Sequence, residues 1–180
     1  IRINGARISE NEILCAGDRV EIFIPSFMEN VPDIKIIYSD KNIAVADKPV
    51  MCGTETTLTD FMRSVFPSAR PVHRLDMNTT GLVVFALNDA AYNELSEIFR
   101  NRTIEKYYSA LVYGAFERKK DVLTAYLKKD SDRAVCEISA TPKNGFVKIV
   151  TEYETQEIFE SYSKIKVKLV TGKTHQIRAH

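Results

Sequence analysis

The 180-residue sequence has few cysteines, and their positions exclude several kinds of stabilised fold. Cys15, Cys52 and Cys136 lie far apart, are odd in number and form no C-x-x-C pair. This spacing argues against a disulfide framework and against a zinc site. It is typical of a protein that works in the reducing cytoplasm, which is the localisation that we expect.

The sequence also lacks an excess of charge of either sign and any long apolar run. Its 25 lysines and arginines nearly balance its 24 aspartates and glutamates, which leaves a formal net charge of +1. A surface that binds nucleic acid must therefore be local. No stretch is apolar enough to cross a membrane. A content of 44% hydrophobic and 27% charged residues is typical of a soluble globular protein.

The sequence does contain a regular succession of strand and helix patterns. Asn4-Gly5 predicts a hairpin turn, and Pro25 and Pro32 bracket a polar connector. Apolar residues at helical spacing predict helices over residues 57–66 and from Asn88 or Asp89 onward. Strands are predicted over residues 34–38, 43–46, 82–87, 104–113, 146–159 and 162–170. The predicted fold class is α+β, with a mostly antiparallel sheet and a few helices.

A stripe of lysines accompanies one of these strands. Lys164, Lys166 and Lys168 alternate with apolar residues, which is the pattern of an antiparallel sheet with one face in water. The sequence leaves two interpretations of this stripe open. The lysines either provide solubility and protect a sheet edge, or they contact RNA.

Two polar stretches stand next to apolar strands and hold the candidate chemistry. In PVHRLDMNTTGLVVFAL, residues 71–87, the ionisable groups of His73, Arg74 and Asp76 directly precede a strand. In TGKTHQIRAH, residues 171–180, Arg178 lies in what reads as the first turns of a helix. Asp76 and Arg178 form either a surface salt bridge of little consequence or a carboxylate nucleophile that a buried cation keeps ionised.

Three other kinds of site fit these stretches poorly. A phosphate-binding loop that ends in GKT needs a glycine where Val167 stands. A kinase catalytic loop needs H-R-D, but Leu75 separates the arginine from the aspartate. His73, His175 and His180 lie on two segments, and the latter two are not spaced to share a helical face, so we expect no metal site.

Taken together, three motifs resemble the RluA family of pseudouridine synthases. They are HRLDMNTTGLVVFAL, EKYYSALVYG and KLVTGKTHQIRAH, in that order, and IKIIYSDKNIAVADKP resembles the family's opening strand pair. The resemblance covers about residues 34–180. It implies an α+β fold with a mostly antiparallel mixed sheet and flanking helices. The family continues beyond these motifs, so we expect the fold to be truncated at the C-terminus.

The N-terminal stretch carries a shorter resemblance. INGARISENEILCAGDRVEIFI is similar to the tail of the alpha-L RNA-binding domain that often precedes these synthases. We therefore expect residues 1–27 to be the C-terminal remnant of such a domain and residues 28–180 to be an incomplete catalytic domain.

The resemblance implies a reaction and a set of site residues. A uridine in folded RNA has its base cut from the ribose, turned and rejoined through a ring carbon, without cofactor, metal or energy source. Asp76 is the carboxylate beside the sugar, Arg178 is the cation that pairs with it, and Tyr108 stacks on the base. The site must be dry, and the target must leave the RNA stack.

Five further residues are implied to contact RNA. Arg74 resembles the arginine that fills the space of the extruded base, and His73 orients the loop. Lys106, Lys173 and His175 complete this set. Lys173 replaces the arginine of the family's TGR, which keeps the charge but loses the bidentate fork. The expected partner is ribosomal RNA more than transfer RNA, and the expected state is a monomer.

Two alternatives belong to other functional classes. A non-catalytic RNA-binding protein on the same scaffold would have no need of Asp76, Tyr108 and Arg178 together. A glycosidase needs a second carboxylate near Asp76, and the motifs offer none.

Overall fold

The computed structural model describes residues 2–8, 13–22, 33–130 and 135–180. The chain forms two compact units, residues 1–33 and residues 34–180. The predicted domain boundary between residues 27 and 28 lies outside the described residues.

The N-terminal unit is a small antiparallel sheet. Its strands β1 (Arg2–Ile3), β2 (Ala6–Arg7) and β3 (Val20–Glu21) have the order β2-β1-β3. Asn4 and Gly5 join β1 to β2 with φ values of 51° and 84°. Positive φ at both central residues defines the type I′ hairpin turn, so the predicted hairpin is confirmed.

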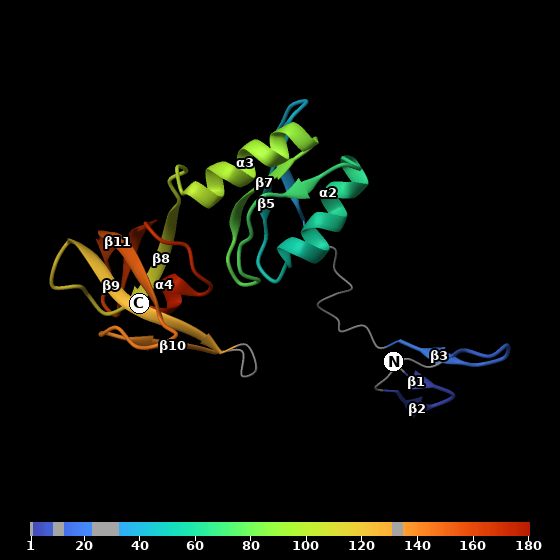
Figure 1. The fold of residues 1–180 in the computed structure, drawn as a ribbon. Helices are drawn as coiled ribbons and strands as arrows, with labels where there is room; N and C mark the ends of the chain where they lie inside the picture. Colours follow the sequence, from blue (N-terminus) through green and yellow to red (C-terminus); the bar gives the residue numbers. More distant parts are fainter. Residues whose placement is uncertain (1, 9–12, 23–32, 131–134) are drawn as a thin grey trace. The chain divides into compact units, whose positions relative to one another are not determined.

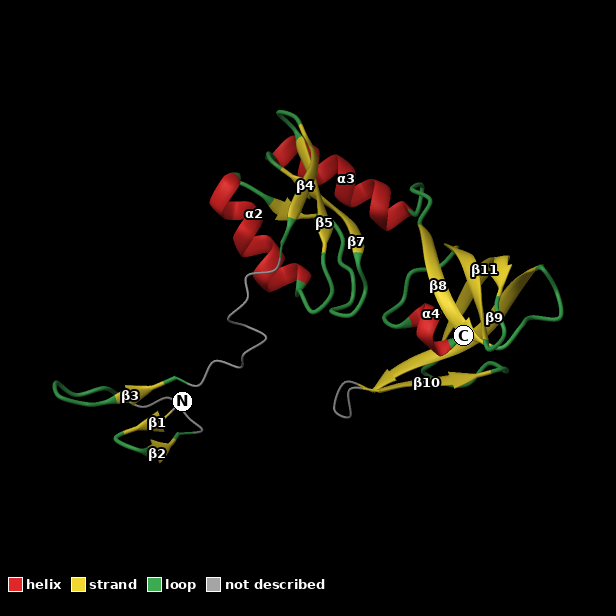
Figure 2. Ribbon diagram, turned by 180° about the vertical axis from the view of Figure 1, so that it is seen from behind, coloured by secondary structure: helices red, strands yellow, loops and turns green. Residues whose placement is uncertain are grey.

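The first half of the larger unit is a four-stranded antiparallel sheet with two helices against it (Figure 2). The strands β4 (Lys35–Ser39), β5 (Ile43–Lys48), β7 (Gly81–Ala86) and β6 (Arg70–Pro71) have the order β4-β5-β7-β6. The helices are α2 (Thr59–Val65), which a π-helical turn at Thr54–Leu58 precedes, and α3 (Asp89–Asn101). Leu58, Met62, Val83 and Phe85 form the solvent-excluded centre of this core.

The second half is a five-stranded antiparallel sheet (Figure 1). Its strands are β8 (Tyr107–Tyr113), β9 (Lys120–Asp130), β10 (Val135–Ser139), β11 (Val147–Ile158) and β12 (Tyr162–Leu169). They have the order β10-β9-β11-β12-β8. The short helix α4 (Gln176–Ala179) follows β12. The predicted α+β class is confirmed, and the strands of this unit are divided between two sheets.

The lysine stripe lies on the solvent side of this second sheet. Ile165 and Val167 are buried, whereas Lys166 is exposed, as the alternating pattern predicts. Lys166 stands opposite Glu154 and Lys168 stands opposite Glu152 on the neighbouring strand β11. Opposite charges on facing strands stabilise a sheet, so acidic side chains accompany the stripe throughout this part of the face.

Candidate active site

The loop between β6 and β7 carries Asp76, and His73 holds its first residues in place. The N–H of Val84 in β7 donates to Nε2 of His73 at 3.1 Å, and the imidazole stacks on Phe99 of α3 with 4.6 Å between ring centroids. Burial, together with the positive charge of Lys106, lowers the pKa of His73 from 6.5 to about 4. His73 is therefore neutral near pH 7 and serves as an acceptor.

Thr54 fixes the residue directly before Asp76. The buried Thr54 hydroxyl donates to the carbonyl oxygen of Leu75 at 3.0 Å and accepts from the N–H of Leu75 at 3.2 Å. The side chain of Leu75 is itself buried in the core of the first sheet. Because both backbone groups of Leu75 are engaged, the position of Asp76 is set by the core.

Lys48 fixes the residue directly after Asp76. This lysine is 0% exposed at the end of β5, and its ammonium donates to the carbonyl oxygens of Pro49, Cys52 and Met77 at 3.0, 2.8 and 3.2 Å. These three acceptors use the whole donor capacity of an ammonium group. Burial lowers the pKa of Lys48, while the neighbouring Cys52 and Asp76 act in the opposite direction.

The opposite side of the site is a turn that Gln176 anchors. Its side chain is 2% exposed, and its carboxamide nitrogen donates to Val150 O at 3.0 Å and to Thr151 Oγ1 at 2.8 Å. Its oxygen accepts from Thr171 Oγ1 at 2.8 Å and from Lys173 N at 3.1 Å. All four hydrogen bonds of an amide side chain are therefore made, and the turn between β12 and α4 is tied to β11.

This turn places His175 against Asp76. His175 has a φ of 57°, and its Nδ1 lies 2.5 Å from Oδ2 of Asp76. The predicted ion pair of Asp76 with Arg178 does not occur among the contacts within 4.0 Å that link described residues. The left-handed backbone at His175 instead directs the imidazole to the carboxylate, and Arg178 remains exposed.

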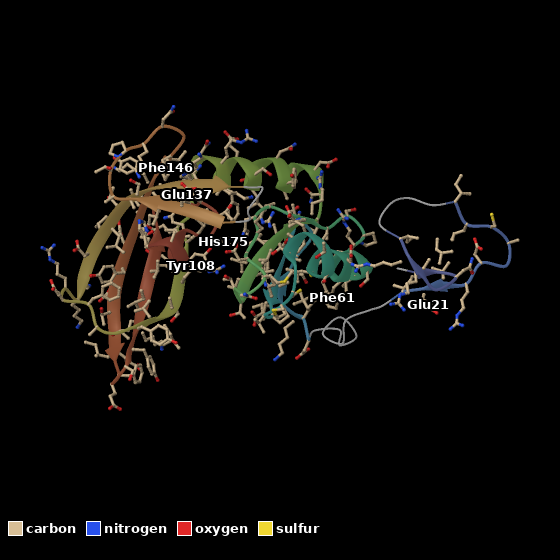
Figure 3. All side chains as sticks on the ribbon, turned by 90° about the horizontal axis from the view of Figure 1, so that it is seen from below. Glu21, Phe61, Tyr108, Glu137, Phe146 and His175 are labelled. Atoms are coloured by element: carbon tan, nitrogen blue, oxygen red, sulfur yellow. The ribbon has the colours of Figure 1, made fainter. Side chains whose placement is uncertain are left out.

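Tyr108 in β8 lies at the junction of the two halves of the unit. It packs against the cores of both sheets, and Figure 3 labels it near His175. Burial raises the pKa of the Tyr108 phenol, and the negative charge of Asp76 raises it further. The phenol is therefore protonated near pH 7, with its ring beside the loop that carries Asp76.

One cavity of about 360 Å³ collects all eight residues that the sequence predicts for the site. Its walls are His73, Arg74, Leu75, Asp76, Thr79, Phe99, Lys106, Tyr108, Leu169, Gly172, Lys173, Thr174, His175, Gln176, Ile177 and Arg178. This volume is within the range of ordinary ligand pockets. Four lysines and arginines and a single carboxylate line it, so its charge suits a polyanion.

The cations of this cavity differ in their surroundings. Arg74 forms an exposed ion pair with Glu55 at 2.6 Å, so it is held at the rim. Burial lowers the pKa of Lys106, and the charge of Arg102 lowers it further. Lys173 and Arg178 are exposed. No group of three or more His, Cys, Asp or Glu side chains that could hold a metal ion occurs among the described residues.

Sequence reasoning did not identify Lys48, Thr54 and Gln176. A signal for Lys48 exists, because it continues the alternation of the buried Ala44 and Ala46 along β5. Thr54 carries no such signal, since its partner Leu75 lies 21 residues away in the sequence. The anchoring role of Gln176 carries none either, since it depends on Val150 and Thr151, which lie 26 and 25 residues away.

Comparison with known proteins identifies the family of this chain. The model of the family described as RNA pseudouridylate synthase matches residues 54–180. The chain belongs to this family, within its RluA branch. Of the solved structures, human RNA pseudouridylate synthase domain containing 1 has a TM-score of 0.74 at 27% identity, covering 88% of this chain and 66% of that one.

Two curated relatives have names that specify a class of RNA. Ribosomal large subunit pseudouridine synthase D of Blochmanniella floridana is 32% identical, covering 96% of this chain and 55% of that protein. Ribosomal large subunit pseudouridine synthase C of Vibrio vulnificus is 29% identical, covering 100% of this chain and 63% of that protein. The chain thus spans 55% of the length of the first of these relatives and 63% of the length of the second.

Among the described residues, no helix is long and apolar enough to span a membrane.

Proposed function

We propose that this chain supplies the catalytic domain of an RNA pseudouridine synthase that isomerises uridines in structured RNA, without metal or cofactor. The observation that carries the proposal is the convergence of three separated motifs on one cavity, around the single carboxylate of Asp76. The dense support of the loop by His73, Thr54 and Lys48 is what a reaction with a fixed nucleophile needs.

In the proposed reaction, the uridine leaves the RNA stack and enters the cavity. The Asp76 carboxylate attacks the anomeric carbon of the ribose or takes a proton from its neighbour, and the bond between sugar and base breaks. The detached base turns against the ring of Tyr108, and its carbon five bonds to the anomeric carbon. In the same step the bond between the anomeric carbon and Asp76 breaks, or the neighbouring carbon takes back its proton from Asp76. Carbon five then loses its proton to water. Because Tyr108 and Asp76 line a cavity backed by both cores, water has limited access to the intermediate.

We further propose that the substrate is ribosomal RNA and that the protein acts as a monomer in the cytoplasm. The names of two curated relatives support the choice of ribosomal over transfer RNA. The overall charge of +1 does not indicate a surface that binds nucleic acid. The lysines and arginines around the cavity provide a basic surface of this kind locally. Residues 1–27 are proposed to be the remnant of an alpha-L RNA-binding domain, which would add contacts to the RNA.

The test uses the full-length protein and RNA transcribed in vitro with tritium at carbon five of uridine. Isomerisation releases this tritium to water. Asp76→Asn removes the nucleophile with little change of shape, so release should fall by about 100-fold or more, while RNA binding remains. Asp60→Asn, at an exposed position of α2, is the matched control and should leave the rate unchanged.

Three results would argue against the proposal. Undiminished release by Asp76→Asn would remove the carboxylate from the mechanism. Binding without release, with both ribosomal and transfer RNA, would favour the non-catalytic RNA-binding protein. Release of free uracil would indicate a glycosidase instead.

A further inference from the structure

The contact between His175 and Asp76 joins residues that are 99 positions apart and that both line the cavity. We propose that His175 is a positioning residue for the Asp76 carboxylate rather than an RNA contact, and that Gln176 holds it there. The inference rests on the proposed function, because it assigns the group that orients the nucleophile of that reaction.

The geometry of the contact defines what His175 does. Its Nδ1 lies 2.5 Å from Oδ2 of Asp76, and an ionised carboxylate accepts the proton of such a ring nitrogen. A charge-assisted hydrogen bond of this kind fixes the rotation of the carboxyl group about its side chain. It occupies Oδ2 and leaves Oδ1 without this hydrogen bond, so in the proposed reaction Oδ1 is the oxygen that acts on the sugar.

The backbone of His175 indicates that the contact is built into the fold. Its φ of 57° lies in the left-handed region, which is unfavourable for a residue other than glycine. Such a conformation persists only where the surroundings enforce it. Here the next residue enforces it, because the four hydrogen bonds of the buried Gln176 side chain fix the turn to β11.

The position of Arg178 supports the same assignment. This arginine lines the cavity, but it is exposed and makes no ion pair with Asp76 within 4.0 Å among the described contacts. The imidazole thus takes the place next to the carboxylate that the sequence assigned to the guanidinium.

The test compares two substitutions that both tolerate a positive φ. His175→Gly removes the side chain, and His175→Asn keeps an amide N–H at the δ position where Nδ1 stands. Tritium release by the full-length protein should show that His175→Gly lowers kcat about 10- to 100-fold with KM for RNA unchanged. His175→Asn should restore most of kcat, and the NMR measurement described below separates the hydrogen bond from a purely conformational role of His175.

Two kinetic outcomes overturn the inference. A rise in KM with kcat unchanged in His175→Gly would make His175 an RNA contact. An equal loss of kcat in His175→Asn and His175→Gly, with both variants folded by circular dichroism, would show that the hydrogen bond is not what matters.

The contact between His175 and Asp76 can also be tested without a measurement of enzymatic activity. In a long-range proton–nitrogen NMR spectrum of protein labelled at histidine, Asp76→Asn should shift the Nδ1 resonance of His175. The Nδ1 resonance of His180, which contacts Thr151, should stay in place. An unchanged His175 resonance overturns the inference. An absence of tritium release from the wild type, with the expected NMR shift, would instead refute the proposed function.

Discussion

His73 is a neutral imidazole in a loop that is crowded with charge, and its neutrality has a consequence for stability. Its pKa in the folded protein is about 4, against 6.5 for an ordinary histidine, first because burial removes water from the ring. Between these two values the unfolded chain binds a proton that the folded protein does not. The contribution of His73 to stability is therefore complete above pH 6.5 and is lost as the pH falls toward 4.

We predict that the free energy of unfolding decreases by about 2 kcal/mol more between pH 7.5 and pH 5 than it would without this histidine. The measurement is urea denaturation at several pH values, for the wild type and for His73→Gln. Glutamine keeps an acceptor for the N–H of Val84 but does not titrate. Its pH dependence should be shallower, and equal slopes in the two proteins would contradict the assignment.

The residues of the site could be predicted only where a motif marks them. All eight predicted side chains line one cavity, because the order of three motifs carries that information. The pairing within the cavity could not be predicted, since the left-handed turn at His175 depends on hydrogen bonds from Gln176 to a strand about 25 residues earlier. Gly81 illustrates the same limit, because its φ of 122°, which residues with a side chain rarely adopt, becomes visible only in the structure.

At the scale of elements, Asn88 decides where α3 begins and how it meets the first sheet. Its side-chain oxygen accepts from the N–H of Ala91 at 2.9 Å, which caps the helix. Its side-chain nitrogen donates to Lys41 O at 3.2 Å and to Asn42 Oδ1 at 3.0 Å, in the turn between β4 and β5. One side chain thus fixes a helix to a turn 46 residues earlier.

We predict that Asn88→Ala destabilises the protein by about 1–2 kcal/mol in urea denaturation, because it removes the cap and both donated bonds. Asn88→Asp is the matched control, since it keeps the capping oxygen and loses only the donors. It should fall between the wild type and the alanine variant. An alanine variant as stable as the wild type would show that water replaces the cap.

Helices and strands could be predicted from the sequence where their apolar residues recur with a clear period. The strands predicted at residues 34–38, 43–46 and 82–87 occur as β4, β5 and β7. The two predicted helices occur as α2 and α3, and the helical turns predicted around Arg178 occur as α4. β9 and β10 were not predicted, because residues 120–139 mix charged and apolar residues without a clean period of two. The π-helical turn at Thr54–Leu58 also has no sequence signal, and its first residue bonds to Leu75, which lies 21 residues later.

At the scale of the whole molecule, charge is distributed unevenly although the total is +1. The lysine stripe on β12 faces Glu152 and Glu154 across the strand pair, and Lys168 is also paired with Glu105. Lys106 and Lys173, in contrast, line the cavity and have no ion-pair partner among the described residues. The open question about the stripe is therefore best answered in favour of solubility and edge protection.

We predict that Lys106→Gln and Lys173→Gln each weaken RNA binding and reduce the slope of log K against log salt by about 0.7 to 0.9. Lys166→Gln, on the stripe, is the matched control and should leave the slope unchanged. Fluorescence anisotropy with labelled ribosomal RNA fragments, between about 50 and 200 mM salt, measures the slopes. A reduced slope for Lys166→Gln would place RNA on the stripe after all.

The distance along the chain between Asp76 and His175 matters while the protein is being made. A ribosome adds about 5–20 residues per second, so the two partners, 99 positions apart, are synthesised about 5–20 s apart. During this interval the nascent chain displays the carboxylate without the imidazole that orients it. The orienting contact is therefore absent from the growing polypeptide, and it forms only when the turn after β12 has emerged and docked.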